Sequence, residues 1–215
     1  MAEPLFHSSR EPASFEVWDA PGRLAQLPLL FVVWWAIANG IGGGLVNYLE
    51  ANGFEFMATL VLTGPIVGVC QWLVLRRYLQ RVRWWAVVSA IAWVLAVQVS
   101  ILGSGFLTPI IDGLYRQFGL WEVFWVNLVN GFVWLGIFGT VQWFLLARQG
   151  WNPLPWLAAT FLGGMVWGGT GAALCNAICG AIAGGFGSTL VGVAAWGVYG
   201  IITGLVLRSY WANRP

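Results

Sequence analysis

The chain alternates long apolar stretches with short polar segments, and six of the stretches resemble membrane-spanning helices in length and composition. A spanning helix needs about 20 mostly apolar residues. The six stretches run over residues 24–49, 55–75, 84–102, 123–147, 155–177 and 188–207. This pattern predicts an all-α fold, a polytopic membrane helical bundle with six transmembrane helices.

The composition points to the same class. Hydrophobic residues make up 59% of the 215 residues and charged residues only 8%, whereas a soluble domain has roughly 25% charged residues. So little charge excludes a soluble surface. The expected partner is membrane lipid, and the sequence has no basic patch that would suggest a nucleic-acid partner.

The arginines are distributed unevenly about the predicted spans. The chain has ten arginines and no lysine. With six spans, nine arginines fall on one side, and only Arg116 falls on the other. The nine are Arg10, Arg23, Arg76, Arg77, Arg81, Arg83, Arg148, Arg208 and Arg214. Since short arginine-rich loops stay cytoplasmic, both termini are predicted to be cytoplasmic.

The two ends of the chain differ from the middle. Residues 1–23 are polar and contain no apolar core like that of a signal peptide, so they are interpreted as a cytoplasmic N-terminal tail that the mature protein keeps. Residues 24–208 form the predicted transmembrane domain, and residues 209–215 form a cytoplasmic C-terminal tail.

Three predicted helix ends resemble one another. "GVCQWLVLRR" at 68–77 matches "GTVQWFLLAR" at 139–148 and, more weakly, "GIITGLVLRS" at 200–209. Any helix that returns to the cytoplasm can end in apolar residues and arginine, but this does not explain why Gly-x-x-Gln-Trp occurs twice. The pattern predicts three repeated helical hairpins, over about 24–77, 84–148 and 155–208.

Five amide side chains fall inside the predicted bundle, namely Asn39, Gln71, Asn130, Gln142 and Asn176. A primary amide in lipid costs several kcal/mol unless it is hydrogen-bonded. The five residues are therefore candidates for helix packing or for ligand binding. If the role of Gln71 is packing alone, Gln71→Leu is expected to cost only about 1 kcal/mol.

Many of the 29 glycines occur in pairs that are four residues apart. Such pairs let helix backbones approach closely in a membrane; a glycine-lined conduit is the alternative. The predicted helix-packing residues are Gly64, Gly68, Gly164, Gly168, Gly180, Gly184, Gly200 and Gly204.

Two further segments allow local predictions. Residues 179–188, "CGAIAGGFGS", are either a break within a long helix or a glycine-rich helix end. Residues 108–119 predict an amphipathic helix in the non-cytoplasmic interface, capped by Thr108 and starting at Pro109.

Residues for catalysis or metal binding are scarce. No acidic or basic residue falls clearly within a predicted span, although proton-coupled transporters rely on such residues. Cys175 and Cys179 lie four apart on one helix face, but no histidine or carboxylate is close to them in sequence. They are interpreted as small packing residues, with no metal site and no catalytic residues, so the protein is not expected to be an enzyme.

The Gln-Trp segments and the Trp-rich stretches "RWWAVVSAIAW" and "WNPLPWLAAT" together resemble a loose group of bacterial multi-pass membrane proteins. Helix ends of that group read Gly-x-x-Gln-Trp-x-x-Leu-Arg, and no activity is established for it. The resemblance covers roughly 64–100 and 136–170. It implies a repeated-hairpin fold in a bacterial inner membrane or a photosynthetic membrane.

Two functions are compatible with these patterns. The first is a non-enzymatic structural or accessory subunit that packs with a membrane-protein partner, a second copy of itself, lipid or photosynthetic pigment. A chlorophyll-type pigment or a carotenoid would be its only cofactor, with Gln71, Asn130 and Gln142 as candidate ligands. The alternative is a channel or facilitator for a small neutral solute, with a central path lined by all five amide residues.

Overall fold

The computed structural model of the chain describes residues 29–79, 82–148, 150, 152–182 and 185–212, and these form helices and turns without any strand. The elements are α1 (Leu29–Leu49), η1 (Glu50–Phe54), α2 (Glu55–Met57), η2 (Ala58–Leu62), α3 (Thr63–Leu75), α4 (Trp85–Leu102), α5 (Ser104–Phe118), α6 (Glu122–Ala147), α7 (Pro153–Ile178) and α8 (Phe186–Ala212). The all-α prediction is confirmed. The predicted tails over 1–23 and 213–215 lie outside the described residues.

Six of the helical segments are long and apolar enough to cross a membrane, as predicted. They are Leu29–Phe54, Ala58–Leu75, Trp85–Leu102, Glu122–Ala147, Pro153–Ile178 and Phe186–Tyr210. Their outer faces carry large exposed apolar side chains, for example Val33, Ile37 and Ile41 on α1. Because exposed apolar side chains suit lipid better than water, these faces fit a bilayer.

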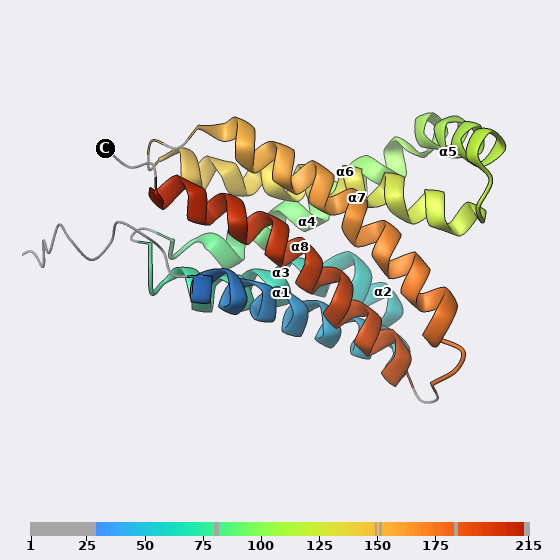
Figure 1. Cartoon of the computed structure of the whole chain (residues 1–215), viewed down its shortest axis with the longest axis horizontal. Coiled ribbons are helices and arrows are strands. Elements are labelled where there is room, and N and C mark those ends of the chain that lie inside the picture. The colour runs from blue at the N-terminus through green and yellow to red at the C-terminus, as the bar shows by residue number, and fades with distance from the viewer. Residues whose placement is uncertain (1–28, 80–81, 149, 151, 183–184, 213–215) are drawn as a thin grey trace, which may run out of the picture.

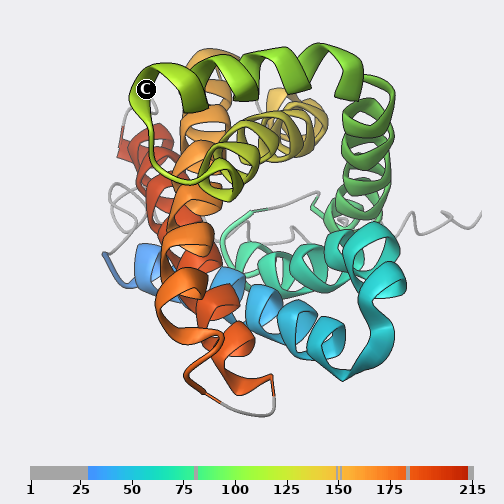
Figure 2. The ribbon, with the colours of Figure 1, turned by 90° about the vertical axis from the view of Figure 1, so that its right-hand side faces the viewer.

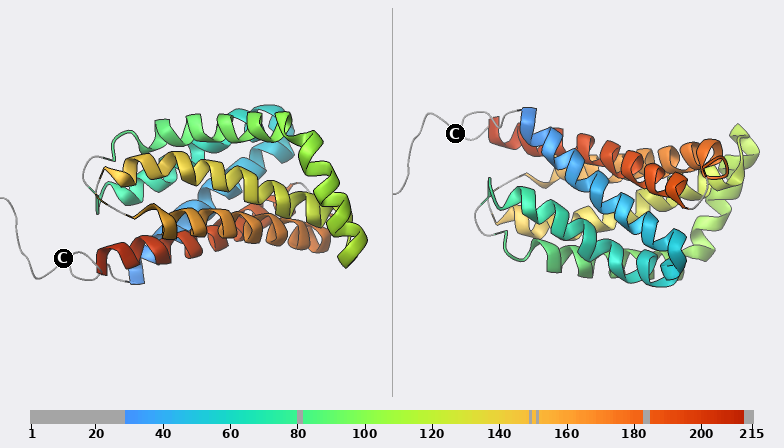
Figure 3. Two further views of the ribbon diagram at one scale, coloured as in Figure 1. Left: turned by 90° about the horizontal axis from the view of Figure 1, so that it is seen from above. Right: turned by 90° about the horizontal axis from the view of Figure 1, so that it is seen from below.

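The six spans form a closed ring. α1 packs against α3, α3 against α4, α4 against α6, α6 against α7, α7 against α8, and α8 against α1. Figures 1 and 3 show the spans running side by side. Each predicted hairpin therefore consists of two neighbours in the ring: α1 with α3, α4 with α6, and α7 with α8.

The two ends of the bundle differ in charge. The start of α1, the end of α8 and the α3–α4 and α6–α7 connections gather at the left in Figure 1. The described arginines of this end, which we call the arginine end, are Arg76, Arg77, Arg83, Arg148 and Arg208. The opposite end, which we call the α5 end, carries Arg116 on α5. This separation is the one that the six-span prediction requires.

The helix α5 lies across its end of the bundle (Figure 2). It starts at Ser104, four residues before the predicted start, and Pro109 lies inside it. The expected cap was wrong because the preceding turn is already helical: the backbone N–H groups of Phe106 and Leu107 donate to Gly103 O. Thr108 donates its hydroxyl to Ser104 O instead of capping the helix. Among the residues of α5, only Ile111 is buried.

Two connections at the α5 end are built differently. Between α1 and α3 the chain reverses at Asn52 and Gly53, where Gly53 has a φ of 91° that favours glycine. The flanking segments η1 and η2 are π-helical. Between α7 and α8, the helix ends at Ile178 and the next begins at Phe186. The 179–188 segment is thus a helix end and a connection, not a break within a span.

The core has three levels along the bundle. Near the arginine end lies an apolar cluster that includes Phe31, Leu75, Leu146 and Leu207. A second cluster, nearer the α5 end, contains Val67, Ala92, Trp93, Val97, Leu135, Phe138, Trp196 and Tyr199. Between the clusters lie buried polar side chains, which we call the polar layer: Asn39, Gln71, Ser89, Gln142, Thr160 and Thr203.

Candidate functional site

The polar layer brings three of the five predicted amides together. Gln71 Nε2 donates to Asn39 Oδ1 at 2.8 Å. Gln142 Nε2 donates to Gln71 Oε1 at 3.0 Å and to Ser89 Oγ at 2.8 Å. All four side chains have an exposed fraction of 0%. The layer therefore links α1, α3, α4 and α6 within the core by buried hydrogen bonds.

Three tryptophans extend the polar layer toward the arginine end. Trp85 Nε1 donates to Gln71 Oε1 at 2.9 Å, Trp35 Nε1 to Thr203 Oγ1 at 3.0 Å, and Trp156 Nε1 to Gly139 O at 2.8 Å. The indole of Trp85 packs edge-on against those of Trp35 and Trp156, with ring centroids 6.3 and 6.4 Å apart. In each case the indole comes from the first helix of one hairpin and the acceptor from the second helix of the hairpin before it around the ring.

The glycines that open the three similar helix ends make matching contacts. A Cβ added to Gly68 would meet Ser89, one added to Gly139 would meet Thr160, and one added to Gly200 would meet Asn39. The residues so met each follow one of the three tryptophans by four positions. This is the relation that three repeated hairpins arranged in a ring predict. In the third helix end, Thr203 stands where the other two have glutamine.

The predicted packing glycines divide into three groups. Gly64, Gly68, Gly200 and Gly204 face side chains or backbone of a neighbouring helix. Gly164 and Gly168 meet backbone carbonyls of α6, those of Gly131 and Asn127. A Cβ on Gly180 would have nothing within 4 Å, so its predicted packing role is wrong: it lies beyond the end of α7. Gly184 lies outside the described residues.

Cys175 and Cys179 form a disulfide at the end of α7, which corrects their interpretation as separate packing residues. The two residues are one turn apart on the same face, and their Cα atoms are 4.7 Å apart, within the range that a disulfide spans. Disulfides persist in oxidising compartments. A disulfide at the α5 end agrees with a cytoplasmic arginine end.

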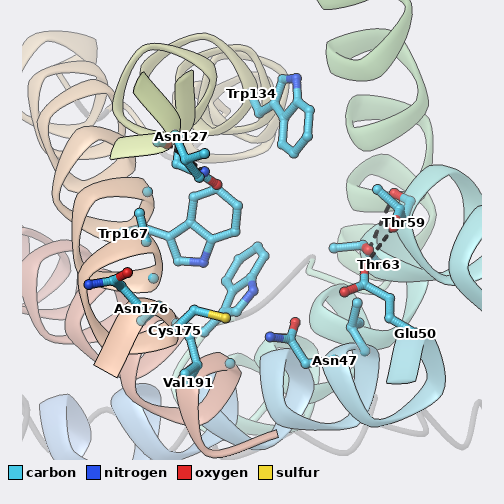
Figure 4. A pocket seen from close by; sticks show the side chains of 18 of the residues that line it. Asn47, Glu50, Thr59, Thr63, Asn127, Trp134, Trp167, Cys175, Asn176 and Val191 are labelled. Atoms are coloured by element: carbon cyan, nitrogen blue, oxygen red, sulfur yellow. Dashed lines mark hydrogen bonds between the residues drawn. The ribbon is translucent and has the colours of Figure 1, made fainter. Parts of the chain in front are cut away.

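A cavity of about 590 Å³ occupies the α5 end of the bundle. Its wall includes four tryptophans from four helices: Trp93, Trp134, Trp167 and Trp196. Successive ring centroids are 5.7 Å (Trp93–Trp134), 6.3 Å (Trp134–Trp167), 5.4 Å (Trp167–Trp196) and 5.9 Å (Trp196–Trp93) apart, so the indoles form a closed ring. We call this ring the tryptophan wall; part of it is visible in Figure 4.

Polar groups surround the rest of the cavity. Glu50 is the only charged residue among the described lining residues, and Thr59 donates its hydroxyl to Glu50 Oε1 at 2.6 Å. Thr59 O in turn accepts from Trp93 Nε1 at 2.6 Å. Asn47, Asn127 and Asn176 also line the cavity. Two indole N–H groups, those of Trp134 and Trp167, have no hydrogen-bond partner in the described part of the chain.

The remaining predicted amides are not part of the polar layer. Asn176 lines the cavity at the end of α7. Asn130 accepts a hydrogen bond from Ser100 Oγ at 3.2 Å and lines a separate space of about 360 Å³ beside α5. The five amides therefore do not line one open path, because three of them are sealed in the core.

Sequence reasoning missed the cavity and Glu50. Glu50 had been assigned to a loop, because the first span was expected to end at Leu49. A signal was nevertheless present: Val46, Asn47 and Glu50 are three and four residues apart, so they share one helix face if α1 continues. The described residues contain no group of three or more histidine, cysteine or acidic residues that could hold a metal ion.

The six apolar helices thus define an integral, multi-pass membrane protein of the helical class. Comparisons with protein-family models, with curated proteins and with solved structures found no match to this chain. The resemblance to the Trp-rich bacterial group therefore stays a prediction from its motifs.

Proposed function

We propose that this protein is a non-enzymatic membrane protein that binds a small, largely apolar molecule in its tryptophan-walled cavity. The cavity itself carries the proposal. Its volume of about 590 Å³ falls in the range of roughly 300–1,000 Å³ that ligand sites occupy, and such sites combine apolar walls with a few polar groups. The unpaired indole N–H groups of Trp134 and Trp167 add to this support, since buried donors without a partner often mark an occupied site.

The core beneath the cavity favours binding over passage. Trp93 lies one turn from Ser89 on α4, and Trp196 lies seven residues from Thr203 on α8, so the polar layer is about 6–11 Å below the wall. Val67, Phe138 and Tyr199 fill this interval and have exposed fractions of 0%. A facilitator of neutral solutes, the alternative function, would have to open both levels.

The position of the amides also bears on pigment binding. Gln71 Oε1 already accepts two hydrogen bonds, from Trp85 and Gln142. Gln142 Oε1 has no partner but is buried in the core. A pigment or lipid would therefore occupy the cavity and not a site formed by these amides. The proposed setting is a bacterial inner membrane or a photosynthetic membrane.

Filling the cavity should remove the bound molecule. Gly171 lines the cavity, and a Cβ there would meet only Ala195, at 3.8 Å. Gly171→Trp should therefore place an indole in the cavity without displacing a helix. The measurement is mass spectrometry and absorption spectroscopy of what co-purifies in mild detergent. We expect a defined small molecule with the wild-type protein and its loss from the variant.

The matched control is Gly197→Trp, because Gly197 lies within α8 outside the described cavity lining and has nothing within 4 Å of an added Cβ. It should keep the small molecule. Both variants must elute as the wild type does. The proposal fails if the co-purifying small molecules are the same in all three proteins, and a colourless wild-type preparation would exclude a pigment.

The proposed orientation places both termini in the cytoplasm. Epitope tags at Met1 and Pro215 should be protected from outside the intact cell, whereas a tag after Asn52, at the reversal between α1 and α3, should be accessible. The measurement is antibody labelling before and after permeabilisation. Labelling of either terminus in intact cells would contradict this orientation.

A further inference from the structure

We propose that the molecule in the cavity is an organic cation, of the quaternary ammonium or phosphonium type, held between the Glu50 carboxylate and the tryptophan wall. This inference rests on the proposed function, that the cavity binds a small molecule. It adds the charge of that molecule and the groups that recognise it.

The charge of the cavity is the first argument. No arginine, lysine or histidine is among the described residues that line it, so Glu50 has no counter-ion there. Its described hydrogen-bond partner is the neutral Thr59 hydroxyl. A carboxylate that is partly withdrawn from water is costly to bury without a positive partner. A cationic occupant supplies the missing charge.

The tryptophan wall is the second argument. The face of an indole attracts cations more strongly than the face of any other side chain, and desolvated cation–π contacts contribute about 2 kcal/mol or more. The four indoles come from α4, α6, α7 and α8 and so cover several sides of one space. Figure 4 shows the Glu50 side chain on the side of the cavity opposite Trp167. Together they form an aromatic enclosure with one negative group.

The carboxylate and the wall are held in a fixed relation, which is the third argument. Thr59 binds both: its hydroxyl donates to Glu50, and its carbonyl oxygen accepts from Trp93. Thr59 lies in the π-helical segment η2, and short π-helical segments occur often at functional sites. The negative group is thus positioned before any cation enters, which lowers the ordering cost of binding.

The test compares two ions of the same shape and opposite charge, tetraphenylphosphonium and tetraphenylborate. Their binding to the purified full-length protein in neutral detergent is measured by equilibrium dialysis, with protein-free micelles as the blank. We expect the cation to bind at least about tenfold more tightly than the anion. Glu50→Gln should weaken binding of the cation about tenfold or more and leave binding of the anion unchanged or stronger.

Glu55→Gln is the matched control, since Glu55 lies five residues away, is exposed and is not among the lining residues. It should change the affinity for the cation less than twofold. The comparison of the two ions on the wild-type protein remains decisive even if Glu50→Gln does not fold.

The possible outcomes separate the two proposals. Equal binding of both ions that disappears in Gly171→Trp would overturn the cation inference and retain the binding function. Binding of neither ion above the blank, together with the same co-purifying molecules in Gly171→Trp and the wild type, would overturn both.

Discussion

Gln71→Leu should lower the free energy of unfolding by about 3 kcal/mol or more, not by the 1 kcal/mol expected from the sequence. Gln71 is hydrogen-bonded to three side chains, those of Asn39, Trp85 and Gln142, which come from three other helices. Leucine would remove all three bonds. Each buried polar group left without a partner costs about 1–3 kcal/mol, and Asn39 Oδ1 and Trp85 Nε1 would both lose the partner that Gln71 provides.

The measurement is an unfolding titration of the purified protein in mixed micelles, with Gln142→Leu as the comparison. Gln142→Leu should cost less, because Gln71 would keep its bonds to Asn39 and Trp85. The double variant should cost less than the sum of the two, since the two amides share a bond. If Gln142→Leu proves the more harmful single change, Gln71 is not the centre of the polar layer.

Gly164→Ala should destabilise the protein by about 2–3 kcal/mol. The added methyl group would meet the backbone carbonyl of Gly131, and α6 would have to move away from α7. Overpacking typically costs about 1–3 kcal/mol, and here the obstacle is backbone, which has no rotamer to change. The gain of up to about 1 kcal/mol from the higher helix propensity of alanine is too small to compensate.

Gly197→Ala is the control of opposite sign. An added Cβ at Gly197 has nothing within 4 Å, so only the helix propensity changes, and the protein should become slightly more stable. The same unfolding titration measures both variants. Equal effects of the two changes would contradict a close backbone contact at Gly164.

Much of the fold could be predicted because the bilayer limits the choices. Six apolar stretches of sufficient length leave few arrangements, and the arginines at the end of α3 and after α6 mark one end of the bundle. The short Gly-x-x-Gln-Trp segments pointed to Gln71 and Gln142 before their contacts were known. Glycine spacing identified true contacts where the neighbouring backbone is close, as at Gly164, but the same spacing at Gly180 lies past a helix end.

The cavity could not be predicted because it depends on how four distant helices face one another. Trp93 and Trp196 are 103 positions apart in the sequence, and no local pattern indicates that their rings pack at 5.9 Å. Glu50 depends on how far α1 extends, and element ends are the least certain part of sequence-based assignment. The Cys175–Cys179 disulfide required knowledge of where α7 ends.

The closure of the ring between α1 and α8 has a consequence for the synthesis of the protein. Trp35 and Thr203, which are bonded across this contact, are 168 residues apart. At about 5–20 residues per second, roughly 8–34 s separate the synthesis of the two residues. During that time the face of α1 that carries Gly40, Gly43 and Gly44 has no α8 to pack against. Assembly must therefore follow insertion of the last span, and a nascent chain that ends before α8 has no tryptophan-walled cavity, because α8 supplies Trp196.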